Sequence, residues 1–104
     1  MADSKYYTVI VSDKAKRMLE MHFRFIANVS KEAARKKKKE LVSAIRSLSH
    51  YPERYPYFEE PYIPSNKYHK MFVKEWYLVL YQIKDNTVYV DVILDCRKDY
   101  NWLL

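Results

Sequence analysis

The sequence contains no glycine among its 104 residues. Glycine is the usual choice wherever a backbone needs a positive φ or must approach a ligand closely. The chain therefore cannot carry a GxGxxG dinucleotide-binding turn, a P-loop or a GxSxG nucleophile elbow. It is also too short for two independent hydrophobic cores, so we expect a single domain over residues 1–104.

Charge and cysteine content narrow the class of protein further. Lys and Arg number 19 against 13 Asp and Glu, which gives a net charge of +6. The single cysteine, Cys96, excludes an intramolecular disulfide and a multi-cysteine zinc site. No apolar run approaches the roughly twenty residues of a membrane span, and the first residues do not form a signal peptide. We expect a basic, cytoplasmic protein without a membrane partner.

The hydrophobic pattern predicts one strand, two helices and then three strands. Residues 5–11 are β-branched and aromatic, as in a strand. Ser12 is placed to cap a helix that runs to about Asn28, and Ser30 to cap a second helix that Pro52 ends. Residues 52–66 hold all four prolines and predict an irregular loop. Three strands follow at residues 68–74, 76–84 and 87–95, the last two joined by a turn at Asp85 and Asn86.

This order predicts a two-layer α+β domain, with the helix pair on one face of a small, largely antiparallel sheet. The other sheet face is then available as a working surface. In residues 68–74, alternation places Met71 and Val73 on one side, and the opposite side receives Tyr68, Lys70, Phe72 and Lys74. In the last strand, one face is expected to carry Val88, Val90, Val92 and Leu94, and the other Tyr89, Asp91, Ile93 and Asp95.

Basic residues gather near two strands that we expect to be close in the sheet. The first group is Lys67, His69, Lys70 and Lys74, and the second, just past the last strand, is Arg97, Lys98 and Tyr100. RNA cleavage without a metal needs a base for the 2′-hydroxyl, cations for the phosphorane and an acid for the leaving oxygen. Such residues can supply these groups. The same cluster also fits a basic surface that binds an anion or a protein without reacting.

Other charged and aromatic residues support function less directly. The run RKKKK at residues 35–39 fits either a solvated helix face or a surface for phosphate or an acidic partner. The many aromatic residues of the strands fit stacking on nucleobases or packing in the core. Asp91, Asp95 and Asp99 are not expected to hold a metal, because basic neighbours would compete for them. We expect neither a metal nor a cofactor.

The order of elements and the stretch WYLVLYQIKDNTVYVDVILDCRKDY at residues 76–100 resemble the RelE/ParE superfamily of type II toxin–antitoxin toxins. The resemblance implies a small toxin that a cognate antitoxin protein keeps inactive, with the antitoxin covering the basic sheet face. RelE-like members cleave mRNA in the ribosome through its own 2′-hydroxyl, without a metal. ParE-like members share the fold and inhibit DNA gyrase.

The resemblance also assigns roles to individual residues. Arg97 and Lys98 match the basic pair after the last strand, Lys70 and Lys74 lie near basic positions of the second strand, and Tyr100 matches the terminal tyrosine. Two positions depart from the pattern: Leu78 stands where many members have arginine, and Asp95 where many have histidine. These changes remove a phosphate clamp and an acid–base group.

The sequence and the resemblance together favour a ribosome-dependent, metal-independent mRNA endoribonuclease toxin. Arg97 would neutralise the phosphorane with help from Lys70 or Lys98, and Tyr100 would stack or transfer a proton. Contacts to RNA would come from Lys67, Tyr68, His69 and Lys74. Two alternatives remain open at this point, namely a non-enzymatic inhibitor of DNA gyrase and an inactive toxin fold that only binds its antitoxin.

Overall fold

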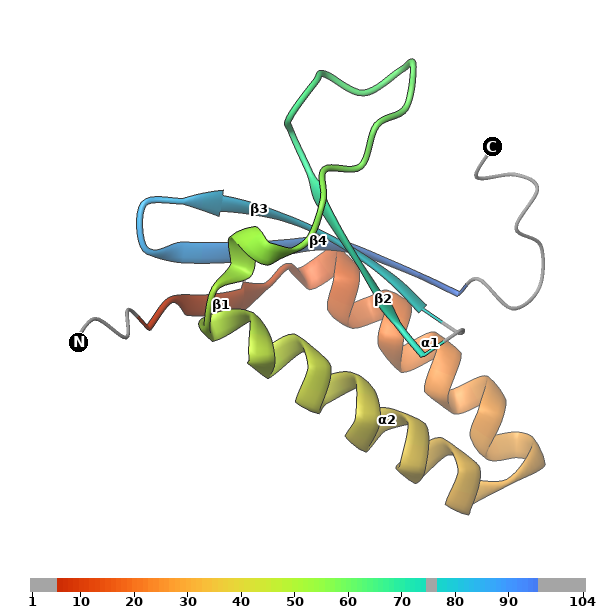
Figure 1. The fold of residues 1–104 in the computed structure, drawn as a ribbon. Helices are drawn as coiled ribbons and strands as arrows, with labels where there is room; N and C mark the ends of the chain where they lie inside the picture. The colour runs from red at the N-terminus through yellow and green to blue at the C-terminus, as the bar shows by residue number, and fades with distance from the viewer. Residues whose placement is uncertain (1–5, 75–76, 96–104) are drawn as a thin grey trace.

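The computed structural model describes residues 6–74 and 77–95 (Figure 1). Its elements are β1 (Thr8–Val11), α1 (Asp13–Val29), α2 (Lys31–Arg46), the short 3₁₀ turns η1 (Ser47–Ser49) and η2 (Pro52–Arg54), β2 (His69–Val73), β3 (Tyr77–Lys84) and β4 (Thr87–Asp95). The predicted order of strand, two helices and three strands is confirmed. Within the described ranges, no helix is long and apolar enough to cross a membrane.

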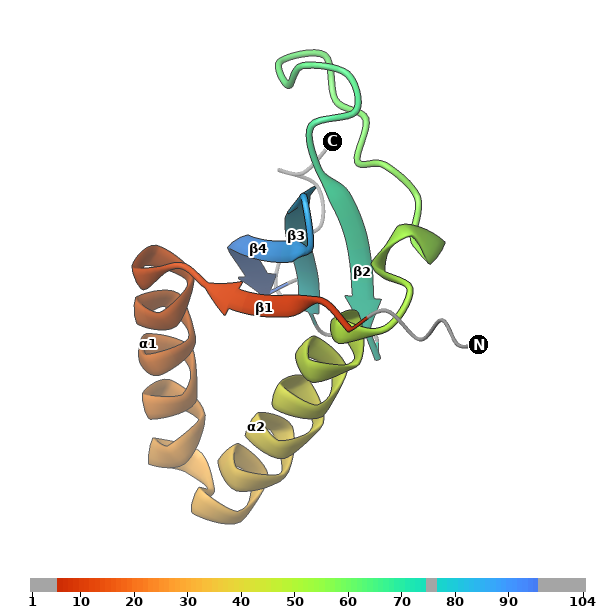
Figure 2. The same ribbon diagram turned by 90° about the vertical axis from the view of Figure 1, so that its left-hand side faces the viewer.

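The four strands form one sheet in the order β1-β4-β3-β2. Strand β1 runs parallel to β4, whereas β4, β3 and β2 are successively antiparallel. Helices α1 and α2 form a hairpin on one side of this sheet, as Figures 1 and 2 show. The predicted two-layer α+β architecture is therefore confirmed.

Both helices begin where a serine can satisfy the first backbone N–H groups. The Ser12 hydroxyl accepts a 3.0 Å hydrogen bond from the backbone N–H of Ala15, and the Ser30 hydroxyl a 3.1 Å bond from that of Ala33. Because Ser30 ends α1 and caps α2, a single residue separates the two helices and forces them into a hairpin.

Without glycine, other residues adopt the left-handed backbone conformation at the turns. Four of them have positive φ in the described ranges: Tyr51, Asn66, Lys74 and Asp85. Asp85 lies in the β3–β4 turn, where the sequence predicts it, and Asn66 ends the loop before β2. Asn and Asp tolerate this conformation better than Tyr or Lys. The backbone at Tyr51 and Lys74 must therefore be stabilised by contacts with neighbouring residues.

The main core lies between the helices and the sheet. Leu41 and Leu48 come from the helical side and meet Val79 and Tyr81 of β3, and all four side chains are fully buried. The Tyr81 hydroxyl donates a 2.6 Å hydrogen bond to the backbone carbonyl of Pro52. This bond attaches the start of the proline-rich loop to the middle of the sheet.

A β-bulge in β4 overturns the predicted alternation of its side chains. Tyr81 pairs with Val90 but its neighbour Leu80 pairs with Val92, so Asp91 is an extra residue in β4. The prediction is correct for Val88 and Val90 and wrong for Val92, Ile93 and Leu94. Ile93 joins the helix-facing core, whereas Val92 packs on the opposite face.

The sheet face away from the helices carries a second apolar cluster. Leu78 and Leu80 are buried there, and partly buried hydrophobic residues pack against them: Phe58, Tyr68, Val92 and Leu94. Phe58 belongs to the proline-rich loop. Its backbone N–H donates a hydrogen bond to the backbone carbonyl of Tyr68. The face predicted to be a working surface is thus apolar at its centre.

Candidate functional site

The structure describes five of the eight residues predicted to form the RNA site. Arg97, Lys98 and Tyr100 lie outside the described residues, so their placement beside the second strand stays a prediction. The five that can be placed are Lys67, Tyr68, His69, Lys70 and Lys74. They fall in three different surroundings.

Lys67, Tyr68 and Lys70 form one group near the beginning of β2. The Lys67 ammonium lies 5.3 Å from the centre of the Tyr68 ring, within the range of a cation–π contact. Lys70 has the same strand parity as Tyr68 and is half-buried. Burial and the Asp91 carboxylate raise the pKa of Tyr68. Its phenol therefore stays neutral at physiological pH.

His69 lies on the other side of β2, with the helix-facing core. Its side chain is buried, and its ring stacks on Tyr81 at a centroid distance of 5.3 Å. Its Nδ1 atom lies 2.7 Å from the backbone carbonyl oxygen of Tyr55. The structure thus separates His69 from Lys70, because neighbouring residues of a strand point to opposite faces.

Lys74 lies at the far end of β2 from Lys67. It borders a shallow pocket with residues of α2, including Lys36, Lys37 and Glu40. Lys74 therefore belongs with the lysine run of α2 and not with the Lys67 group. The structure brings these basic residues together through the contact of β2 with α2, which the spacing in the sequence did not predict.

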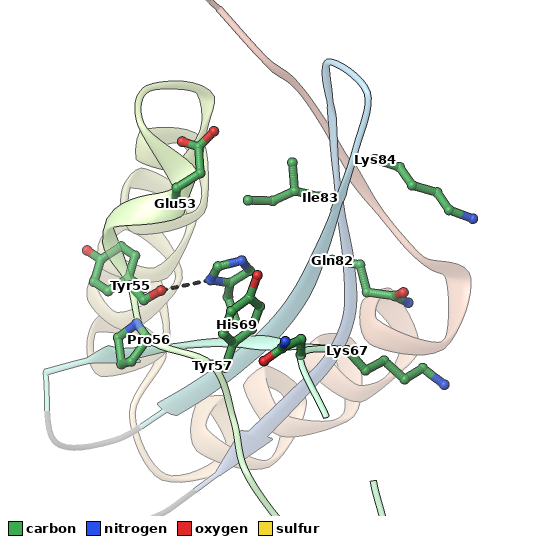
Figure 3. Close-up of a pocket in the computed structure, with 10 residues that line it drawn as sticks. Glu53, Tyr55, Pro56, Tyr57, Lys67, His69, Gln82, Ile83 and Lys84 are labelled. Atoms are coloured by element: carbon green, nitrogen blue, oxygen red, sulfur yellow. Dashed lines mark hydrogen bonds between the residues drawn. The ribbon is translucent and has the colours of Figure 1, made fainter. Parts of the chain in front are cut away.

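A pocket opens between η2, the loop that follows it, the beginning of β2 and the end of β3 (Figure 3). Its volume is about 530 Å³. The residues that line it are Glu53, Tyr55, Pro56, Tyr57, Asn66, Lys67, His69, Gln82, Ile83 and Lys84. Of these, the sequence singled out only Lys67 and His69. The aromatic and proline-rich composition of residues 52–66 was the available signal for the rest.

A second concave region lies along α1, α2 and β1. It consists of two adjoining pockets of about 430 and 260 Å³ that share Lys16, Leu19 and Val42. Val9 and Val11 of β1 extend the apolar floor. Four basic side chains and one acidic side chain also line it: Lys16, Arg24, Lys38, Arg46 and Glu20. We call this region the helix groove, and the sequence reading missed it because its apolar residues were counted as core.

Two further tyrosines have their ionisation suppressed. Burial raises the pKa of Tyr81, whose hydroxyl is bonded inside the core. The hydrogen bond that Tyr7 donates to a Glu53 carboxylate oxygen, at 2.6 Å, raises the pKa of Tyr7. These phenols hold their protons as structural donors and are poorly suited to transfer them in acid–base chemistry.

Two comparisons with known proteins found a match. A family model described as the ParE toxin of the type II toxin–antitoxin system parDE matches residues 9–100. A solved chain from the "Chromosomal ParDE TA system from P. aeruginosa" has a similar fold, with a TM-score of 0.72 at 14% sequence identity. The match covers 88% of this chain and 98% of that one. A search of curated proteins found no match.

Proposed function

We propose, since this chain belongs to the ParE toxin family of type II toxin–antitoxin systems, that it inhibits DNA gyrase by binding and not by cleaving RNA. A toxin of this class has a cognate antitoxin as its partner. The family resemblance offers both activities, because RelE-like members cleave mRNA and ParE-like members act on gyrase. The arrangement of β3 favours the second.

The observation that carries this proposal is the burial of Leu78. This residue occupies the position where many members of the superfamily have an arginine that can hold the phosphate. Here its side chain is 1% exposed and packs in the apolar cluster with Leu80. A buried, uncharged side chain cannot clamp a phosphate, because it offers neither charge nor hydrogen-bond donors.

Ribosome-dependent mRNA cleavage is the second candidate, and the grouping of Lys67, Tyr68 and Lys70 favours it. These residues supply two cations and an aromatic ring beside one another at the beginning of β2. In that case Arg97, Lys98 and Tyr100 would complete the site from the segment after β4. An inactive toxin fold that only binds its antitoxin is the third possibility.

We further propose that the antitoxin occupies the helix groove and not the basic sheet face. The groove combines an apolar floor, which includes Leu19 and Val42, with a charged rim in which four basic side chains outnumber the single acidic one, Glu20. An amphipathic segment with an acidic face fits this pattern, because its apolar side would be buried and its carboxylates would meet the rim.

Expression of the chain in bacteria, with two readouts taken from the same culture, tests the proposed activity. We expect a reporter plasmid to lose negative supercoiling while the 5′ ends of mRNA stay unchanged. Message cut at A-site codons with normal supercoiling would establish the endoribonuclease instead. Unaffected growth, message and supercoiling would indicate an inactive toxin fold.

A further inference from the structure

We propose that the pocket of Figure 3 is a binding site for a nucleoside 5′-phosphate whose base carries an exocyclic amine. The site lies apart from Leu78 and from the helix groove. It does not depend on gyrase inhibition, so either inference can fail alone. We call this pocket the loop pocket.

His69 gives the loop pocket a fixed hydrogen-bond acceptor. A carbonyl oxygen can only accept, so the 2.7 Å contact between His69 Nδ1 and the Tyr55 carbonyl places a hydrogen on Nδ1. In the neutral imidazole, Nε2 then carries a lone pair. Figure 3 shows the ring with Nδ1 toward Tyr55 and its other nitrogen turned away from that carbonyl, on the side of the pocket.

Aromatic packing holds this acceptor rigid. The His69 ring stacks on Tyr81 with an interplanar angle of 15°, and the Tyr57 ring lies on it at a centroid distance of 4.3 Å. Tyr57 remains 41% exposed, so part of its ring is available to a ligand. A planar base can pack against Tyr57 and Ile83 and direct an amine toward His69 Nε2.

The charges of the loop pocket are divided between its two sides and set the orientation of the ligand. Glu53 stands on one side, where its carboxylate accepts from the Tyr7 hydroxyl. Lys67 and Lys84 line the other side and are both exposed; their side chains flank Gln82 and extend outward from the mouth of the pocket (Figure 3). A phosphate would be repelled by Glu53 and attracted to the lysines, whereas an amine-bearing base edge suits the Glu53 and His69 side.

The volume of the loop pocket agrees with this ligand class. At about 530 Å³ it falls within the range of pockets that hold small molecules and cofactors. A lone phosphate would leave the aromatic wall unused, and an uncharged base would leave the lysines unused. A nucleoside phosphate such as AMP uses both.

The test is titration calorimetry of the full chain with AMP, IMP and ribose 5-phosphate. We expect AMP to bind with a Kd below about 1 mM, IMP at least fivefold more weakly, and ribose 5-phosphate not measurably. IMP is informative because a carbonyl oxygen replaces the exocyclic amine, with a hydrogen added at N1 and the rest of the nucleotide unchanged. Equal affinity for AMP and ribose 5-phosphate, or no AMP binding at millimolar concentration, would overturn the proposal.

Two variants and one control locate the binding. Tyr57→Ala and the pair Lys67→Ala and Lys84→Ala should each weaken AMP binding at least tenfold, since these exposed side chains supply the proposed contacts. The pair Lys31→Ala and Lys39→Ala, at two exposed positions of α2, removes the same two charges elsewhere and should leave affinity unchanged. Circular dichroism confirms that each variant folds. Full AMP affinity in Tyr57→Ala would overturn the site.

A nucleoside phosphate can be free or can form the 5′ end of an RNA, and the same assay separates the two sources. A 5′-phosphorylated RNA that begins with adenosine should compete with AMP for the loop pocket if nucleic acid ends are its ligand. Selective binding of AMP indicates the free nucleotide. Either result supports the site only if Tyr57→Ala weakens the binding that was observed. RNA binding of unchanged affinity in Tyr57→Ala would contradict the proposed site.

Discussion

Replacing Tyr81 with phenylalanine removes a single hydroxyl from the centre of the core. Tyr81 is fully buried, and its hydroxyl donates a 2.6 Å hydrogen bond to the carbonyl of the buried Pro52. The substitution leaves that carbonyl without its donor and keeps the ring. We expect the free energy of unfolding at pH 7 to fall by about 1–3 kcal/mol, the usual cost of a buried polar group that has lost its partner.

The same residue makes stability depend on alkaline pH. Burial raises the pKa of folded Tyr81 above its ordinary value of 10.0. The unfolded chain therefore loses this proton at lower pH than the folded chain does. The resulting stabilisation is complete below pH 10 and declines as pH rises through the folded-state pKa, by up to about 1.4 kcal/mol per pH unit.

Urea unfolding of the two proteins at pH 7 and pH 10.8 measures both effects. The wild type should be more stable at pH 7, and its advantage over Tyr81→Phe should shrink at the higher pH, because only the wild type has this ionising group. Tyr7 and Tyr68 titrate in both proteins and cancel in the comparison. A stability difference below about 0.5 kcal/mol at pH 7, or one that is constant with pH, would refute the reasoning.

Three further predictions concern the helices and their groove. Ser30→Ala should lower the free energy of unfolding by about 1 kcal/mol in a urea titration, because the cap of α2 is lost. Ser43→Ala, at an exposed position of α2, is the control, and equal effects of the two substitutions would contradict the capping role of Ser30. Leu48→Ala should cost about 2–5 kcal/mol in the same assay, since it empties a fully buried position; a loss below 1 kcal/mol would contradict the placement of the core. Val42→Glu should weaken antitoxin binding at least tenfold by calorimetry, whereas Lys36→Glu should not; equal affinities would place the antitoxin elsewhere.

Local signals in the sequence account for the parts of the fold that were predicted correctly. Ser12 and Ser30 cap their helices through bonds that span three residues, and Asp85 turns the chain within the β3–β4 hairpin. The order of the elements along the chain follows from the period of the apolar residues within each segment. None of these features depends on a distant part of the chain.

The bulge at Asp91 is a feature that local sequence signals do not predict. One extra residue in β4 reverses the faces of Val92 and Ile93, and only the pairing with β3 reveals it. His69 is a different case, because it has the same parity as Met71 and Val73, which were placed correctly on the helix side. Alternation alone therefore indicates that His69 lies on the same side of β2 as Met71 and Val73. The prediction grouped it with the lysines instead, because its side chain is basic.

The loop pocket and the helix groove depend on contacts between segments that are far apart in the sequence. The loop pocket exists because the proline-rich loop pairs with β2, through the bridge between Tyr57 and His69. The helix groove exists because β1 lies beside the helix hairpin, leaving Val9 and Val11 incompletely covered. Composition marks these residues as aromatic or apolar, but only the tertiary arrangement distinguishes a pocket wall from a core position.

The most direct test of the central claim is a supercoiling assay with purified DNA gyrase, relaxed plasmid and ATP. The proposed function predicts that the chain blocks supercoiling in proportion to its concentration, and that prior addition of the cognate antitoxin restores it. A parallel translation reaction should leave mRNA intact. Full gyrase activity at saturating toxin, with ribosome-dependent cuts in the message, would contradict the proposal and return the function to RNA cleavage.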